Sequence, residues 1–255
     1  MLLVIDIGNT EIVLGLFVNE ALRSHWRLSS TINRTSDEYW ILFTTWCRQM
    51  RIDVKDIKGT VICSVVPSLS SAIAEFSTRY LNLDPLFITS ETNTGLNILY
   101  DTPRTVGADR ICNAVAGFDA YGGPLIVVDF GTATTFDVVS EKGEYVGGII
   151  ALGVMGSSHE LHRIAAKLPR VNLEFPSKVV GNTTESSMQS GIMWGTVALI
   201  EGLIDRISNE MNWKTKHVIA TGGISEIFSK KCRKIDASLP FLTLNGMRLI
   251  YNRNQ

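Results

Sequence analysis

The chain has 255 residues, of which 45% are hydrophobic and 19% charged, a balance that is ordinary for a folded enzyme and excludes an intrinsically disordered protein. A formal net charge of -1 gives no overall field to attract nucleic acid or acidic membranes. We therefore expect no nucleic-acid or membrane partner. The length allows one large domain or two of about 120 residues.

The cysteines and the N-terminal residues indicate the cellular compartment of the protein. Cys47, Cys63, Cys112 and Cys232 form no CxxC pair and no framework of close spacings, so neither a zinc site nor a disulfide scaffold is indicated. The apolar N-terminus lacks a basic leader, and no window approaches about 18 uninterrupted apolar residues. A reducing, cytoplasmic location fits this pattern best.

The first half of the chain predicts strands followed by alternating helices and strands. A buried strand is expected at 2–6, and segments 11–17 and 21–29 form an antiparallel hairpin. Thr35 and Glu38 have the spacing of a capping box, which predicts a helix over 36–50. The other expected elements are a strand at 59–66 that Pro67 ends, a helix with Leu69, Ile73, Phe76 and Tyr80, a strand at 85–89, and a helix from Gly107 to residues 121–123.

The second half repeats this order, so a domain boundary is expected between residues 122 and 123. Strands are predicted at 125–129, 134–139, 144–150 and 216–223. Gly147 and Gly148 mark a bulge or a close backbone approach. The strongest helical pattern consists of Met193, Val197, Ile200, Ile204, Ile207 and Met211.

Two predicted strands end on a carboxylate followed by a glycine, in DIGNT at 6–10 and DFGTATT at 129–135. A tight glycine turn leaves backbone N–H groups that attract phosphate, and the carboxylate suits the accompanying cation. Either run alone is more often a turn with a side-chain cap. Together with ATGG at 220–223, they resemble the superfamily of actin, Hsp70 and sugar kinases, in which ATP lies between two related domains.

A candidate acceptor site lies in YDTPRTVGADRICNA, residues 100–114. Asp109 stands in the first turn of its predicted helix, where the helix dipole favours a negative charge, and Arg110 can hold an anion. Taken alone, such a residue is more often a simple helix cap. Phosphoryl transfer needs a positioned carboxylate, so Asp109 is a candidate to orient and deprotonate a hydroxyl group.

Eight motifs in order make the chain resemble a type III pantothenate kinase over nearly its whole length. They are DIGNT, YDxPxxVGADR, VDFGTATTFD, GGII, AAKLP, NTTESSMQSG, TGG and LTLNGM. The resemblance implies an α/β protein of two ribonuclease H-like domains, residues 1–122 and 123–255, each a mixed sheet flanked by helices in the actin-like ATPase architecture. It also implies a homodimer that phosphorylates pantothenate with ATP, in the first step toward coenzyme A.

The same resemblance assigns roles by position. The ATP phosphates would contact Asp6, Ile7, Gly8, Asn9, Thr10, Glu11, Ile12 and Val13, with a further ATP contact from Thr132. Asp129 would bind the K+ or NH4+ that the family requires beside Mg2+. Pantothenate would contact Tyr100, Gly107, Ala108, Asp109 and Arg110, with Asp109 as proton acceptor. Counting back from QSG makes Thr184, rather than Thr183, the pantothenate contact donated across the dimer.

The chain departs from the family pattern after GGII, where Ala151, Leu152 and Gly153 replace the usual Pro-Gly, and at Glu160, where alanine is usual. His159 and His162 share a predicted helix but have no third ligand nearby, so a solvated helix face is expected.

Two other functions compete with this hypothesis. The fold serves many acceptors, so the chain could be a kinase for another small hydroxyl compound, although GADR argues against it. A nucleotide-binding regulator of transcription is the second alternative. The sequence has no helix-turn-helix signal or basic stripe to support it.

Overall fold

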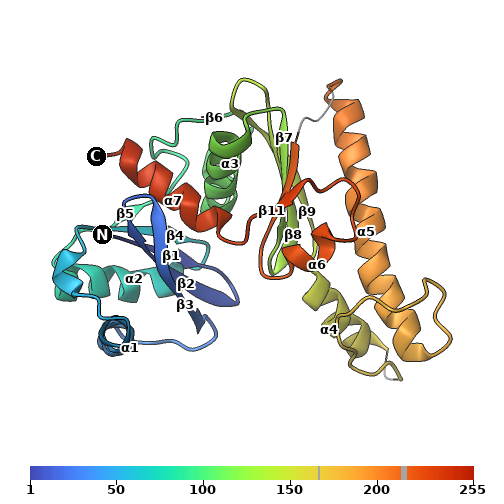
Figure 1. Ribbon diagram of the computed structural model, residues 1–255, viewed down its shortest axis with the longest axis horizontal. Helices are drawn as coiled ribbons and strands as arrows, with labels where there is room; N and C mark the ends of the chain where they lie inside the picture. The colour runs from blue at the N-terminus through green and yellow to red at the C-terminus, as the bar shows by residue number, and fades with distance from the viewer. Residues whose placement is uncertain (166, 214–216) are drawn as a thin grey trace. The chain divides into compact units, whose positions relative to one another are not determined.

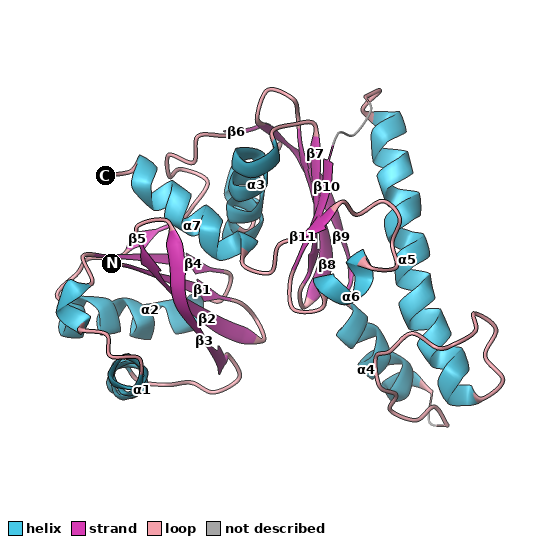
Figure 2. Cartoon of the chain, in the orientation of Figure 1, coloured by secondary structure: helices cyan, strands magenta, loops and turns pink. Residues whose placement is uncertain are grey.

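The computed structural model describes residues 1–165, 167–213 and 217–255, and its contacts divide the chain into two compact units. The first unit contains residues 1–116 and 242–255, and the second contains residues 117–241. Each unit is built on a mixed β-sheet flanked by helices, as the sequence predicts (Figures 1 and 2). Because the first unit includes the C-terminal residues, the units are not two consecutive halves of the chain.

The sheet of the first unit has the order β3-β2-β1-β4-β5, in which β1, β2 and β3 are antiparallel while β4 and β5 run parallel to β1. The strands are β1 (Leu2–Ile7), β2 (Glu11–Val18), β3 (Ala21–Ser29), β4 (Gly59–Ser64) and β5 (Leu86–Phe87). The helix predicted over 36–50 is α1 (Ser36–Gln49), and its capping box between Thr35 and Glu38 is confirmed. β4 ends two residues earlier than predicted, because Pro67 opens α2 (Pro67–Phe76) at its first turn.

Alternate residues of β1 point to opposite faces of this sheet. Leu3, Ile5 and Ile7 belong to a core cluster that also includes Phe43 of α1 and Phe76 of α2. These two helices therefore cover one face of the sheet.

The other face of the sheet is covered by α7 (Leu242–Arg253), a helix that the sequence analysis did not predict. An added Cβ on Gly15 would lie 2.9 Å from atoms of Val4 and Leu244, so the glycine makes room for α7. The remaining elements of this part of the chain are short turns at Val54–Asp56, Ser77–Leu81 and Pro103–Thr105, β6 (Asn97–Ile98), and α3 (Ala108–Tyr121).

The second unit repeats the strand order and directions of the first. Five strands of its six-stranded sheet follow the order β9-β8-β7-β10-β11, with β7, β8 and β9 antiparallel and β10 and β11 parallel to β7. The short β6 is the sixth strand and is the neighbour of β9. They are β7 (Leu125–Phe130), β8 (Ala133–Val139), β9 (Glu144–Leu152), β10 (His217–Thr221) and β11 (Ala237–Ser238). Gly147 has φ 148° beside a register shift between Val138 and Val139, which confirms the predicted bulge. The predicted strand at 216–223 begins on Lys216, which lies outside the described residues.

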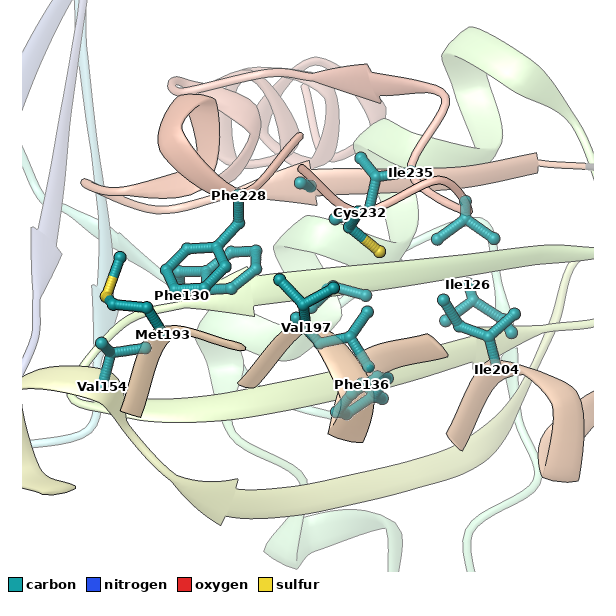
Figure 3. Packing of buried hydrophobic residues seen from close by; sticks show 14 of the residues in the cluster. Ile126, Phe130, Phe136, Val154, Met193, Val197, Ile204, Phe228, Cys232 and Ile235 are labelled. Carbon is teal, nitrogen blue, oxygen red and sulfur yellow. The ribbon is translucent and has the colours of Figure 1, made fainter. Parts of the chain in front are cut away.

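The helices that lie wholly within the second unit are α4 (Val154–Ile164), α5 (Thr184–Glu210) and α6 (Ser225–Ser229). Figure 3 shows Ile126, Phe130 and Phe136 of the sheet packed with Val197 of α5 and Phe228 of α6. α5 begins nine residues before Met193, because Thr183 and Ser186 form a capping box there. No helix in the described part of the chain is long and apolar enough to span a membrane.

Candidate active site

The first carboxylate-glycine run folds as a tight hairpin between β1 and β2, here called the first hairpin (residues 6–13). The Gly8 amide donates to the Glu11 carbonyl at 3.0 Å, and Ile7 pairs with Ile12 on either side of the turn. Ser30, at the end of β3, donates from its amide to the Thr10 carbonyl at 3.0 Å and from its hydroxyl to the Gly8 carbonyl at 2.6 Å. The turn is therefore fixed from the β3 side.

Two buried thiols lie next to two candidate site carboxylates. Asp6 of β1 pairs in register with Cys63 of β4, and Cys112 follows Asp109 by three residues along α3. The hydrogen bond with Cys112, together with burial, raises the pKa of Cys63 well above its usual range, and burial raises the pKa of Cys112. The charges of Asp6 and Asp109 raise the pKa of both thiols further. Asp6 and Asp109 are 103 positions apart in the sequence. Both nevertheless lie near the same pair of thiols.

Asp109 lies half-buried at the N-terminus of α3. The Gly107 carbonyl accepts from the Ile111 amide at 3.1 Å, and the Arg110 amide donates to Asp109 Oδ1 at 2.8 Å. A Cβ on Gly107 would lie 2.4 Å from the same Oδ1, so glycine leaves the space that the carboxylate occupies. Burial raises the pKa of Asp109, and the Arg110 hydrogen bond and charge only partly oppose this. Such a carboxylate is a stronger base than a free aspartate.

Tyr100 is half-buried and is joined to Gly107 through the turn at Pro103–Thr105. In that turn, the Thr105 amide donates to the Thr102 carbonyl at 2.9 Å and the Val106 amide donates to the Pro103 carbonyl at 3.2 Å. Arg104 forms an exposed ion pair with Glu91 at 2.6 Å. The segment from Tyr100 to Arg110 is thus a structured loop that leads into the helix carrying Asp109.

The second hairpin (residues 129–135) has the same design in the second unit. Asp129 pairs with Thr135 of β8 and with Thr221 of β10, and the Gly131 amide donates to the Ala133 carbonyl at 3.1 Å. Gly222 follows Thr221 with φ 93°, and a Cβ there would lie 2.5 Å from the Phe130 carbonyl oxygen and 2.7 Å from Asp129 Oδ1. The late Thr-Gly-Gly motif therefore lies directly against the second hairpin, and two oxygens converge on Gly222.

This contact predicts a large effect for Gly222→Ala. Gly222 has a left-handed backbone conformation, and the methyl group of alanine would lie 2.5 Å from the Phe130 carbonyl oxygen. We therefore expect the free energy of unfolding to fall by about 2 kcal/mol in this variant. Gly223→Ala is the matched control, because its Cβ would meet no described atom within 4 Å. Denaturant unfolding measures both variants, and equal stabilities would contradict the close contact.

Comparisons with known proteins decide the family. The model of the type III pantothenate kinase family matches residues 2–206. A type III pantothenate kinase from Moorella thermoacetica is 47% identical over 254 residues, with 100% of both chains covered. The chain belongs to the type III pantothenate kinase family. It is therefore a kinase, and its family implies ATP and a divalent metal ion as requirements.

Solved structures agree on the fold. A Campylobacter jejuni protein assigned to the Baf family of transcriptional activators matches with a TM-score of 0.64 at 19% identity, covering 99% of this chain and 98% of that one. A Sinorhizobium meliloti protein assigned as a 2-dehydro-3-deoxygalactonokinase matches with a TM-score of 0.57 at 10% identity, covering 99% and 95%. At these identities the likeness concerns the fold alone, and it confirms the actin-like architecture of two mixed sheets flanked by helices.

The departures of this type III pantothenate kinase sequence from the family pattern have local structural explanations. Leu152, where proline is usual, pairs with Ala133 and extends β9 by backbone pairing, which proline would disfavour. Gly153 follows, and its Cβ would lie 2.2 Å from the Thr132 carbonyl oxygen. Glu160 accepts from Arg163 Nε at 2.8 Å, an exposed ion pair one turn along α4.

The two threonines at the start of α5 are placed differently. Thr183 is the N-cap: its hydroxyl accepts from the Ser186 amide at 3.1 Å, and Ser186 Oγ accepts from the Thr183 amide at 3.1 Å. Thr184 is the first helical residue and is exposed. The side chain of Thr183 thus has a structural role in the helix start.

His159 and His162 both lie on α4, as predicted, and His162 Nδ1 is 2.6 Å from the Leu168 carbonyl oxygen. Within the described ranges, no group of three or more His, Cys, Asp or Glu side chains could hold a metal ion. The AAKLP motif includes Ala166, which lies outside the described residues.

Sequence reasoning missed four residues that contribute to these hairpins and their surroundings. Ser30 fixes the first hairpin, Gly153 lies against Thr132 of the second, and Cys63 with Cys112 lies beside Asp6 and Asp109. Ser30 and Cys63 give no sequence signal, because their contacts depend on strand register. Gly153 had one, since a glycine between a strand and a helix often marks a close backbone approach.

Proposed function

We propose that this kinase transfers the γ-phosphoryl group of ATP to the 4'-hydroxyl group of pantothenate. The product would be 4'-phosphopantothenate, formed in the first step of coenzyme A biosynthesis. One observation carries the proposal: Asp6 and Asp109 both lie near the thiols of Cys63 and Cys112. The candidate phosphate-site carboxylate and the candidate base are therefore in one part of the first unit. All four cysteines are buried free thiols, which suits a reducing cytoplasm.

The first hairpin is proposed to hold the ATP phosphates through Asp6 to Val13, with a further ATP contact from Thr132. Backbone N–H groups in a tight turn attract phosphate oxygens without a cationic side chain. Asn9, Thr10 and Glu11 are exposed at the tip of the turn, while Ser30 holds the carbonyls of Gly8 and Thr10. Mg2+ would neutralise phosphate charge, and the Asp6 carboxylate is an oxygen ligand of the kind that this ion prefers.

Asp109 is proposed as the general base. Its carboxylate would accept the proton of the 4'-hydroxyl as the oxygen attacks the γ-phosphorus, and the bond from that phosphorus to the bridging oxygen would break to release ADP. Arg110 would bind an anionic group of pantothenate, and Tyr100, Gly107 and Ala108 would complete its site. The residues from Tyr100 to Arg110 are called the acceptor segment below.

Asp129 is proposed to bind K+ or NH4+. Asp129 Oδ1 and the Phe130 carbonyl oxygen both converge on Gly222, and oxygen donors of this kind fit a hard monovalent cation. We expect Asp129→Asn to lose the stimulation of activity by K+ over Na+, with turnover in K+ reduced about tenfold. Steady-state rates in KCl and NaCl measure this, with Asp119→Asn, an exposed site on α3, as control. Full retention of K+ stimulation in Asp129→Asn would exclude this role.

A homodimer is proposed to bring Thr184 to the pantothenate site of the partner subunit. On α5, the glycines at 191, 195 and 202 would each accept a Cβ without meeting a described atom within 4 Å, and Leu199 between them is 40% exposed. Small side chains at a helix surface allow a second helix to approach closely, so this face suits contact with a second copy. Thr184 is exposed at the start of the same helix. Light scattering on the purified protein tests this, and a monomer at working concentration would contradict it.

ADP release with a panel of acceptors tests the proposed activity. Purified protein with ATP, Mg2+ and K+ is mixed with pantothenate, a hexose or glycerol, and ADP is followed by a coupled assay. Pantothenate alone should stimulate ADP release. Equal or greater stimulation by the hexose or glycerol would favour a kinase for another hydroxyl compound.

A further inference from the structure

The C-terminal helix α7 holds the chain just before the acceptor segment. The Arg253 guanidinium donates to the Thr94 carbonyl oxygen, and Asn254 Nδ2 donates to the Asn93 carbonyl oxygen at 2.9 Å. Asn93 Nδ2 in turn donates to the Arg253 carbonyl oxygen at 3.3 Å. Asn93 and Thr94 are therefore tied to the end of α7 by three hydrogen bonds.

The backbone at this point is specialised for the contact. Gly95 has φ 75°, and a Cβ there would lie 2.7 Å from Arg253 Nη1. Thr94 is only 3% exposed, and its hydroxyl accepts from the Leu96 amide at 3.2 Å. A buried carbonyl that accepts from a charged donor makes a stronger contact than a neutral pair. The turn is thus ordered by Arg253 directly before β6 and Tyr100.

The same helix holds the chain just after the acceptor segment. Thr243 Oγ1 donates to Asn113 Oδ1 at 2.8 Å, and Asn113 is fully buried in α3. A Cβ on Gly246 would lie 2.0 Å from the Cys112 carbonyl oxygen, so α7 and α3 are in backbone contact there. Asp109 and Arg110 precede these contacts by two to four residues on α3.

We propose that α7 clamps both ends of the acceptor segment, with Arg253 and Thr243 as positioning residues for the alcohol substrate. The inference rests on the proposed function, because it takes Tyr100 to Arg110 as the pantothenate site. α7 lies outside residues 2–206, the part matched by the family model. Small displacements of a positioned group are costly for binding and reaction. Because Arg253 and Thr243 bond the chain on either side of Tyr100 to Arg110, their loss should affect the acceptor more than ATP.

The test compares Arg253→Gln and Thr243→Val with the wild type in KM for pantothenate, KM for ATP and Tm. Each variant should raise KM for pantothenate about tenfold, as expected for the loss of a buried hydrogen bond, while KM for ATP stays within about twofold. Arg253→Lys, which keeps a charged donor, should recover most of the affinity. Asn252→Ala, an exposed neighbour on α7, is the matched control and should match the wild type.

Hydrogen exchange gives a second readout that does not depend on turnover. Amides of residues 97–106 should exchange faster in Arg253→Gln and at the wild-type rate in Asn252→Ala. Unchanged exchange, an unchanged KM for pantothenate, or an equal rise of both KM values would overturn the clamp. Failure of the wild type to release ADP with pantothenate would overturn the proposed function instead, and the clamp's assignment to this acceptor with it.

Discussion

Asp109→Asn is expected to lower kcat for pantothenate phosphorylation about a thousandfold while leaving ATP binding unchanged, because a general base in this class contributes about 10² to 10⁴ to the rate. Asparagine has nearly the same shape and cannot accept the hydroxyl proton. Burial raises the pKa of Asp109, so its charged form is disfavoured in the folded protein. Removing that charge should therefore leave Tm at neutral pH unchanged or higher.

The pH profile distinguishes a base from a capping residue. The carboxylate acts when ionised, so activity should be present above its pKa and lost as pH falls through it. Because that pKa is raised, the acid limb of kcat/KM should lie above the range of a free aspartate, which titrates near about 3.9. Asp119→Asn, exposed on the same helix, is the control. If Asp109→Asn kept the wild-type kcat, Asp109 would be a helix cap and not the general base.

Asp6→Asn is expected to lower kcat about a hundredfold and to raise the Mg2+ concentration needed for half-maximal rate. Asp6 is the only carboxylate within β1, and the proposal assigns it to the cation that accompanies the ATP phosphates. Asparagine keeps the size of the side chain but loses its charge. Titration of the steady-state rate with Mg2+ measures both effects.

The control for Asp6→Asn is Glu20→Gln, an exposed carboxylate at the opposite end of the β2–β3 hairpin. It removes the same formal charge from the same sheet, so a general electrostatic effect would appear in both variants. If Asp6→Asn kept the wild-type rate and Mg2+ dependence, the first hairpin would not be the phosphate site.

The parts of the fold that the sequence predicted are those with local signals. The strand β1 is an apolar run that ends near Asp6, and α1 begins with a capping box. The repeated Asp-x-Gly runs predicted two related sheets. Five strands of the second sheet follow the strand order of the first, which confirms that the repetition in sequence is a repetition in structure.

The parts that could not be predicted depend on contacts between distant residues. α7 has few strong helical signals, and its place depends on Gly15, Gly246 and Thr243, which meet partners far away in the sequence. The neighbourhood of Asp6, Cys63 and Asp109 depends on the parallel register of β1 and β4, which no local pattern specifies. The roles assigned to Asp109, Asp129 and Thr184 rest on the family motif and stay predictions.

Phosphorus NMR of the purified protein with pantothenate, ATP, Mg2+ and K+ tests the central claim most directly. The proposed function predicts a phosphomonoester resonance that grows as ADP appears, is slowed in Na+, and is absent over the same period for Asp109→Asn. Formation of inorganic phosphate alone, or no change in the ATP signals with active, folded protein, would contradict pantothenate phosphorylation by this chain.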